Sequence, residues 1–277
     1  MYLKHFGLHE LPFGITPDTA FAYSLQHHQE AINTLLLALG QGEGFVKISG
    51  EVGTGKTLLC RRLLQSLGET WVTAYLPNPN LRPETLLQAL AEELGLQDAA
   101  TLDQYHLLRR LNHALLDFAR AKKRVVVCID EAQAMPLDTL ETLRLLSNLE
   151  TEKRKLLQIV LFGQPELDEK LRRPEVRQLQ QRIAFHYRLG GLKKAEIGHY
   201  IAHRLNVAGY RGDGLFSSAA LRGIYRASGG TPRLVNILAH KSLLSVFGEG
   251  RQTVKWHHVR RAGRDTEGAR SMGWLPW

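Results

Sequence analysis

The chain has 277 residues, 44% of them hydrophobic and 23% charged, with a formal net charge of +9 at pH 7. This length accommodates one α/β domain and a smaller second domain, and the apolar content is that of a globular protein. No stretch approaches the roughly 18 consecutive apolar residues of a membrane span, and the N-terminus lacks the apolar run of a signal peptide. We therefore expect a cytoplasmic protein, or one peripheral to a membrane.

The positive charge is concentrated in the C-terminal third of the sequence. Residues 191–277 contain 14 Lys and Arg against 5 Asp and Glu, whereas residues 1–190 contain 22 of each kind. Such a basic region either faces nucleic acid, anionic lipid or an acidic protein surface, or is a solvated surface without a dedicated partner. The two cysteines, Cys60 and Cys128, lie in apolar segments, so we expect core residues and not a disulfide or a zinc site.

Residues 1–44 begin with turn signals and continue as an amphipathic helix predicted over residues 23–39. Pro12 and Pro17 interrupt the first part, which we expect to form an ordered strap. Its aromatic residues either pack in the core or cover the base of a nucleotide bound by the segment that follows.

A glycine-rich segment follows the short strand predicted over residues 45–49 and precedes an apolar helix predicted over residues 58–67. It fits the pattern G-x-x-x-x-G-K-[ST] at every fixed position and consists of Gly50, Glu51, Val52, Gly53, Thr54, Gly55, Lys56 and Thr57. In this pattern, backbone N–H groups and a helix N-terminus surround the phosphates of a nucleoside triphosphate. We expect Lys56 to reach the β- and γ-phosphates and Thr57 to bind Mg²⁺. The alternative, a glycine-rich turn that binds nothing, does not explain the flanking strand and helix.

Two consecutive carboxylates end the next strongly apolar strand. The pattern predicts a strand over residues 71–76, helices over residues 83–94 and 102–121, and then a buried strand that leads into Asp130 and Glu131. Ligands bind at the carboxyl ends of strands in an open parallel sheet. We therefore expect Asp130 to hold Mg²⁺ and Glu131 to polarise the attacking water. The alternative is an acidic turn without a function.

A polar residue and several arginines follow the next helix, predicted over residues 136–149, and the next strand, predicted over residues 156–162. Gln164 comes directly after this strand and either positions the lytic water or is a turn residue before Pro165. In the arginine-rich segment 171–183, we expect Arg177 or Arg182 to act on the nucleotide of a neighbouring subunit.

The sequence after Gly190 and Gly191 is predicted to be entirely helical. A helix starts behind Ser217, and another is expected to start at Pro232, with Thr231 as its N-cap. Arg233 therefore lies at a helix start after two glycines, where it can swing onto a phosphate; the alternative is a solvent-exposed arginine. A last helix is predicted over residues 254–262, and residues 266–277 read as a flexible tail. The pair His199 and His203 has metal-ligand spacing but no evident third ligand, so we interpret it as surface or packing residues.

This order of parts resembles the AAA+ ATPases over nearly the whole chain. The resemblance implies an α/β fold, namely a P-loop NTPase with a parallel αβα sandwich core followed by a small all-helical lid. It divides the chain into a strap and helix (1–44), an ATPase core (45–190), a lid (191–265) and the tail (266–277). It also implies Mg²⁺-dependent ATP hydrolysis, with Gln164 as the sensor 1 residue and Arg233 as the sensor 2 arginine. Arg182, which precedes an apolar residue, is then favoured over Arg177 as the arginine finger, and homo-oligomers are expected.

Three segments are similar to the general secretion pathway protein A group. They contain Phe6-Gly7-Leu8 with Pro12-Phe13, the run over residues 143–151, and Gly163-Gln164-Pro165-Glu166-Leu167. Because the sequence ends at Trp277 without a periplasmic region, we expect the short form that acts in biogenesis of mannose-sensitive haemagglutinin (MSHA) pili. Its partners would be pilus or secretion assembly proteins at the inner membrane.

Two alternatives to the envelope-assembly function remain open at this point. The same ATPase form occurs in transposition helpers and origin-recognition relatives, and the basic lid is compatible with contact to DNA or to anionic lipid. A scaffold that binds ATP without turnover is the other alternative, and an intact Glu131 argues against it.

Overall fold

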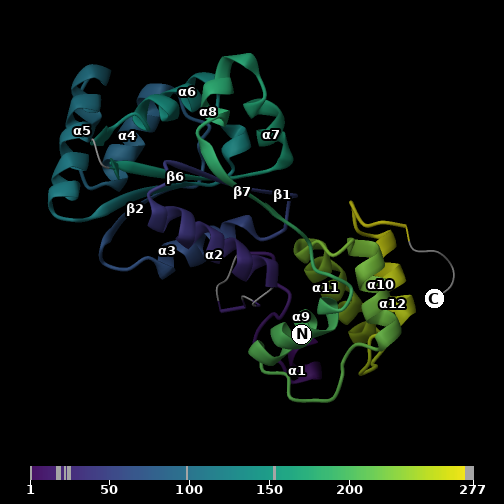
Figure 1. Ribbon diagram of the computed structural model, residues 1–277. Coiled ribbons are helices and arrows are strands. Elements are labelled where there is room, and N and C mark those ends of the chain that lie inside the picture. Colours follow the sequence, from purple (N-terminus) through teal and green to yellow (C-terminus); the bar gives the residue numbers. More distant parts are fainter. Residues whose placement is uncertain are drawn as a thin grey trace. The chain divides into compact units, whose positions relative to one another are not determined.

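The computed structural model describes residues 2–16, 20–21, 23, 26–97, 99–151 and 154–271. The chain divides into two compact units (Figure 1). The sheet unit comprises Gln26–Glu51 and Leu59–Leu189, and the helical unit comprises Met1–Leu25, Val52–Leu58 and Gly190–Trp277. The predicted segment 1–44 is thus shared between the units. Part of the predicted tail, residues 272–277, lies outside the described residues.

A five-stranded parallel sheet forms the centre of the sheet unit, with the strand order β2-β3-β6-β1-β7. The strands are β1 (Phe45–Gly50), β2 (Trp71–Leu76), β3 (Arg124–Ile129), β6 (Leu157–Gly163) and β7 (Ile183–Leu189). Three of the central strands are buried almost throughout, as expected of parallel strands with helices on both faces. The short strands β4 (Glu150–Thr151) and β5 (Arg154–Lys155) pair separately as an antiparallel hairpin.

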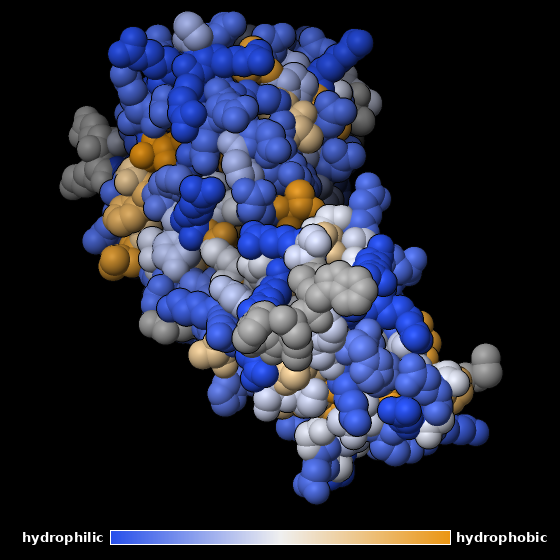
Figure 2. Space-filling model, turned by 90° about the vertical axis from the view of Figure 1, so that its right-hand side faces the viewer, coloured by the Kyte–Doolittle hydropathy of each residue, from blue (hydrophilic) through white to orange (hydrophobic). Residues whose placement is uncertain are grey.

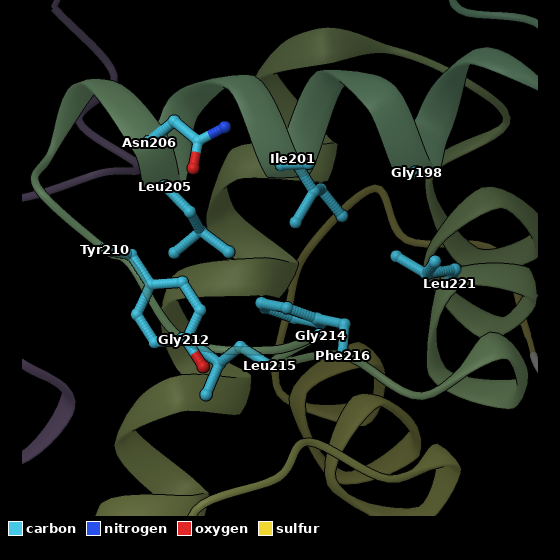
Figure 3. A pocket seen from close by; sticks show the side chains of 11 residues that line it. Gly198, Ile201, Leu205, Asn206, Tyr210, Gly212, Gly214, Leu215, Phe216 and Leu221 are labelled. Carbon is cyan, nitrogen blue, oxygen red and sulfur yellow. The ribbon is translucent and has the colours of Figure 1, made fainter.

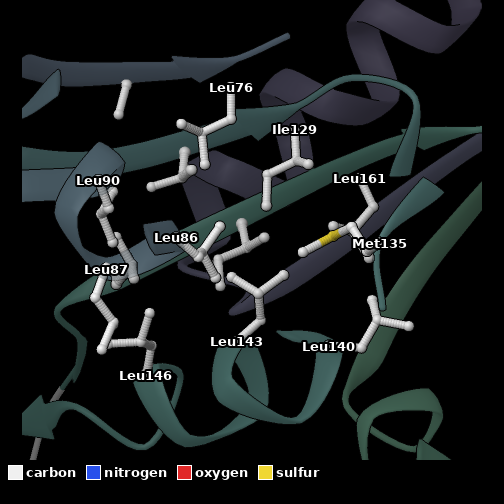
Figure 4. Close-up of a cluster of buried hydrophobic side chains, with 14 of the residues drawn as sticks. Leu76, Leu86, Leu87, Leu90, Ile129, Met135, Leu140, Leu143, Leu146 and Leu161 are labelled. Atoms are coloured by element: carbon white, nitrogen blue, oxygen red, sulfur yellow. The ribbon is translucent and has the colours of Figure 1, made fainter. Parts of the chain in front are cut away.

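Helices cover both faces of this sheet. On one face lie α4 (Pro83–Glu93), α5 (Gln104–Arg120) and α6 (Leu137–Leu146), whose leucines pack on alternate strand residues (Figure 4). In that view, side chains of α4 and α6 point toward Leu76, Ile129 and Leu161 of the strands. On the other face, α2 (Gln26–Gln41) and α3 (Lys56–Ser66) pack against the intervening strand residues. Because strand side chains alternate between faces, each central strand contributes to both clusters.

The remaining elements of the sheet unit are short turns and helices. They are the 3₁₀ turns η1 (Ala99–Thr101), η2 (Ala132–Ala134) and η3 (Pro174–Val176), and the helices α7 (Pro165–Leu171) and α8 (Arg177–Gln180). Cys60 and Cys128 are both buried, as predicted for core residues.

The helical unit has its own hydrophobic core. It contains α1 (Tyr2–Phe6), α9 (Glu196–Val207), α10 (Ser218–Ser228), α11 (Pro232–Gly248) and α12 (Trp256–Arg264). The N-terminal strap packs in this core through Phe6, Leu8 and Phe13. The buried guanidinium of Arg204 fixes the strap by donating hydrogen bonds to the carbonyls of Pro12 (2.6 Å) and Gly14 (3.2 Å). Residues 2–16 of the strap are therefore an ordered part of the helical unit.

On the face shown in Figure 2, hydrophilic side chains predominate and hydrophobic ones form separate patches. Among helices of the described residues, none combines the length and the apolar character that crossing a membrane requires.

Candidate nucleotide-binding site

The phosphate loop connects β1 to α3. Gly50 ends β1 within the parallel sheet, and α3 begins at Lys56. Gly53 and Gly55 have φ values of 78° and 96°, which residues with a Cβ rarely adopt. Thr54 and Lys56 are 2% and 5% exposed, whereas the Val52 side chain is exposed. This pattern of left-handed glycines before a helix N-terminus is the backbone that surrounds phosphate groups in such loops.

Arg233 directly contacts the phosphate loop within the helical unit. Its backbone N–H donates a hydrogen bond to the Gly53 carbonyl at 3.3 Å. A Cβ placed on Gly53 would lie 2.5 Å from the Cβ of Arg233. Gly53 is thus required both for its backbone conformation and for the close approach of α11. Arg233 is the second residue of α11, Pro232 is the first, and Thr231 occupies the N-cap position.

The two carboxylates follow β3 in the sheet unit. Asp130 is 2% exposed, and its carboxylate accepts hydrogen bonds from the Glu131 N–H (2.9 Å) and from the Tyr75 hydroxyl (3.5 Å). Burial, together with the negative charge of Asp130, raises the pKa of Tyr75 to about 12, so this hydroxyl remains a donor. Glu131 has a φ of 51°, a conformation that costs a residue with a side chain about 1–2 kcal/mol. Backbone strain of this kind is concentrated at functional sites.

Glu131 and Gln164 lie together, and a third residue, Gln133, joins them. The Oε2 atom of Glu131 accepts hydrogen bonds from the side-chain amides of Gln133 (2.5 Å) and Gln164 (3.0 Å). The Gln133 Oε1 atom in turn accepts the backbone N–H of Gln164 at 3.0 Å. We call Glu131, Gln133 and Gln164 the amide–carboxylate cluster. It links the residues that follow β3 and β6, two neighbouring strands of the parallel sheet.

Sequence reasoning did not identify Gln133. The signal for it is the position two residues after the second carboxylate, in Asp130-Glu131-Ala132-Gln133. The left-handed conformation of Glu131 directs the chain into the turn η2, where the Gln133 side chain meets that of Glu131. A glutamate rarely adopts this conformation, and the sequence does not predict it.

Of the two candidate finger arginines, Arg182 is held inside the sheet unit. Its guanidinium donates a hydrogen bond to the hydroxyl of Ser147, the C-cap residue of α6, at 2.8 Å. The Arg177 side chain is exposed on α8.

The predicted site residues thus form two sets, each within one unit. The first contains Gly53 and Arg233 with the other loop residues from Val52 onward, and the second contains Asp130, Glu131 and Gln164. Gly50 belongs to the sheet unit, and its strand pairs with β6, so that Ser49 lies beside Gly163. The chemistry of these residues suits the expected ligands. Backbone N–H groups of such a loop bind phosphates. The hydroxyl oxygen of Thr57 and the carboxylate oxygens of Asp130 are of the kind that Mg²⁺ prefers as ligands.

One group of possible metal ligands occurs elsewhere in the described residues, at Glu249, His257 and His258. The buried His258 accepts the Lys255 N–H at Nδ1 (2.8 Å), so the proton of the neutral ring lies on Nε2, which contacts Glu249 (3.0 Å). This proton blocks metal binding at Nε2. The hydrogen bond from His258, with smaller contributions from neighbouring arginines, holds the pKa of the Glu249 carboxyl below its usual value. His258 therefore caps the start of α12, and Glu249 is hydrogen-bonded to His258 and ion-paired with Arg251 and Arg261.

The helical unit also contains an apolar cavity of about 240 Å³ (Figure 3). Side chains of α9, α10 and the segment between them surround it, among them Ile201, Leu205, Tyr210 and Phe216. None of the predicted site residues lines this cavity.

Comparison with known sequences finds a matching domain family and a similar protein. Residues 39–171 match the AAA domain family. The chain is 42% identical over 276 residues to general secretion pathway protein A of Aeromonas hydrophila. This match covers 99% of the chain but only 50% of that protein, so the chain spans about half the length of this relative.

Comparison with solved structures concerns the fold. The Orc2 protein of Aeropyrum pernix, in its ADPNP–ADP complexes, has a TM-score of 0.66 at 18% identity, covering 91% of this chain and 72% of that one. Cdc6p of Pyrobaculum aerophilum has a TM-score of 0.68 at 21% identity, covering 90% and 70%. The predicted fold class is thereby confirmed. Residues 39–171 match the AAA domain family, and the chain has the AAA P-loop NTPase fold, a parallel sheet with helices followed by a helical C-terminal region.

Proposed function

We propose that this protein binds ATP with Mg²⁺ and hydrolyses it to drive assembly of a type IV pilus of the MSHA kind, or of a secretion apparatus, at the bacterial envelope. The observation that carries the ATPase activity is the amide–carboxylate cluster beside the buried Asp130, in a chain with an intact phosphate loop. The envelope function is supported by the 42% identity to general secretion pathway protein A over nearly the whole chain.

Each predicted residue has a separate task in this proposal. The loop residues 50–57 bind the phosphates through backbone N–H groups and the ammonium of Lys56. Thr57 and Asp130 hold Mg²⁺, which neutralises phosphate charge when bound. Glu131 takes the proton of the attacking water, and Gln164 orients that water. Arg233 contacts the phosphates from the start of α11.

We further propose that the active species is a homo-oligomer, in which Arg182 of one subunit stabilises the transition state in the next subunit. Arg177 is the alternative. Its side chain is exposed in the single chain and is therefore accessible to a neighbouring subunit. For Arg182 to act, its hydrogen bond to Ser147 has to be exchanged for one to the neighbouring nucleotide.

Replacement of Lys56 tests the proposal directly. In Lys56→Ala, loss of the ammonium removes a ground-state phosphate contact, so fluorescent ATP analogues should bind at least tenfold more weakly and phosphate release should stop. Lys123→Ala, an exposed lysine before β3, is the matched control. Unchanged nucleotide affinity in Lys56→Ala would contradict the assignment of the phosphate loop.

A second candidate function, ATP-dependent handling of DNA, is favoured by the basic C-terminal region. Exposed basic residues on and around α12 include Arg251, Lys255 and Arg264. A partner that neutralises them with phosphate groups would bind less tightly as salt rises, through counterion release. Anionic lipid would respond to salt in a similar way, so salt dependence alone does not identify the partner.

A direct comparison separates the two functions. The triple variant Arg251→Gln, Lys255→Gln, Arg264→Gln is compared with Arg109→Gln, Arg110→Gln, Lys123→Gln, which removes the same charge from exposed positions of the sheet unit. Binding is measured to duplex DNA and to vesicles containing anionic lipid at about 150 mM salt. The envelope function predicts vesicle binding that only the first triple variant loses. Tight DNA binding lost in the first triple variant, with none to vesicles, favours DNA handling.

A further inference from the structure

The sequence analysis assigned no role to Gln133. In the structure, both the nitrogen and the oxygen of its side-chain amide form hydrogen bonds. Its amide nitrogen donates to Glu131, and its amide oxygen accepts the backbone N–H of Gln164. Its own backbone carbonyl accepts a hydrogen bond from Lys170 of α7 (2.5 Å), which also donates to the Met135 carbonyl (2.7 Å). Side chain and backbone of Gln133 are therefore both held within the sheet unit.

The partners determine the orientation of the Gln133 amide. A backbone N–H can only donate, so the oxygen has to face Gln164, and an ionised carboxylate can only accept, so the nitrogen has to face Glu131. The amide thus acts as a spacer with opposite polarity at its two ends. Apart from a neutral histidine, no other uncharged side chain of similar length offers both a donor and an acceptor in one plane.

The position of the Glu131 carboxylate depends on side-chain hydrogen bonds, because the backbone of Glu131 does not fix the orientation of its side chain. The residue sits at a φ of 51°, close to the end of β3, and its side chain has three rotatable bonds. Two amide donors on one carboxylate oxygen restrict those rotations, and hydrogen bonds to a charged acceptor are among the stronger ones. Gln133 restrains the second donor as well, because it binds the backbone of Gln164.

We propose that Gln133 is a positioning residue for ATP hydrolysis: it holds the carboxylate of Glu131 and the amide of Gln164 in one fixed mutual geometry. The inference rests on the proposed ATPase function and deepens it. Gln133 acts through Glu131 and not on the nucleotide, so it affects the chemical step and leaves nucleotide binding unchanged.

Two variants test this role. Gln133→Met keeps the length of the side chain and removes both hydrogen bonds, and Gln133→Glu keeps the acceptor for Gln164 but turns a like charge toward Glu131. We expect kcat to fall about tenfold in Gln133→Met and further in Gln133→Glu, with the affinity for ATP within about twofold of wild type. Gln29→Met, an exposed glutamine of α2, is the control for the substitution itself. Thermal unfolding shows whether each variant is folded.

A mutant cycle distinguishes positioning from a general structural effect. In the Glu131→Gln background, Gln133→Met should change the slow residual rate of single-turnover phosphate release by less than twofold, because the carboxylate that Gln133 positions is already removed. An equal tenfold loss in both backgrounds, a matching loss of ATP affinity, or a Gln133→Met variant with wild-type kcat would each overturn the role of Gln133. Two other results would contradict the proposed ATPase function itself. Either the wild-type protein releases no phosphate, or Glu131→Gln releases phosphate at the wild-type rate. In both cases the role of Gln133 is contradicted as well.

Discussion

Gly53 shows at the scale of a single residue how the phosphate loop depends on its surroundings. Its positive φ is expected of such a loop, but the contact with Arg233 depends on a segment 180 residues later in the sequence. We predict that Gly53→Ala lowers the free energy of unfolding by about 2 kcal/mol, from backbone strain and from the displaced Arg233, and weakens nucleotide binding. Chemical denaturation and nucleotide titration measure the two effects.

Gly68→Ala is the matched control, because a methyl group placed on Gly68 would meet no atom within 4 Å and the residue has no positive φ. The control should unfold within about 0.5 kcal/mol of wild type and bind nucleotide normally. Equal stability of the two variants would show that the close approach of Arg233 to Gly53 is not a constraint.

Part of the candidate site could be predicted from the types and spacing of its residues. The phosphate loop, Asp130 and Glu131 could be identified because their chemistry requires particular residues at fixed spacing after apolar strands. Gln133 could not, because its role depends on the left-handed backbone of Glu131 and on a hydrogen bond to Gln164, 31 residues later. Nor could the sequence predict that Arg182 would contact Ser147.

At the scale of elements, the N-cap of α10 gives a prediction about stability that does not depend on nucleotide binding. The Ser217 side chain accepts the N–H of Ala220 (3.2 Å) at the start of α10, as its position predicted. Ser217→Ala should lower the free energy of unfolding by about 1 kcal/mol, since one helix N–H loses its partner. Ser218→Ala, at the exposed first position of the same helix, should have a much smaller effect in the same denaturation experiment. A larger loss in Ser218→Ala than in Ser217→Ala would contradict the capping role.

Strand and helix patterns predicted four of the five strands of the parallel sheet, and the absence of the fifth, β7, from the prediction has a physical explanation. The edge strand β7 was not predicted, because its segment directly follows the arginine-rich run and carries His186 and Arg188. The alternation of Ile183, Phe185, Tyr187 and Leu189 is nevertheless the period of a half-buried strand. Strand β2 was predicted with its observed bounds, because an alternating run ends at two prolines.

At the scale of the whole molecule, the proposed trans-acting arginine makes activity depend on assembly. We predict that the ATPase rate per subunit rises with protein concentration and that Arg182→Ala lowers kcat on the order of 10³-fold with little change in ATP affinity. Ser147→Ala removes the intrachain partner of Arg182 but keeps the arginine, so it should remain active.

Mixing two inactive variants tests the same claim without relying on concentration. Arg182→Ala subunits keep an intact phosphate loop, and Lys56→Ala subunits keep the arginine, so mixed oligomers should recover part of the activity. If the mixture stays inactive while both variants still assemble with wild-type protein, Arg182 does not act in trans. Recovery with Arg177→Ala in place of Arg182→Ala would favour the alternative finger.

The most direct test of the proposed mechanism is to identify the nucleotide that Glu131→Gln retains after incubation with ATP and Mg²⁺. Glu131 serves the chemical step, whereas the phosphate loop binds the ground state, so the variant should keep its affinity and carry unhydrolysed ATP. Chromatography of the bound nucleotide, with wild-type protein in parallel, gives the answer. We predict ATP on the variant and ADP on the wild type; ADP on both, formed at equal rates, would contradict the assignment of Glu131 and with it the proposed mechanism.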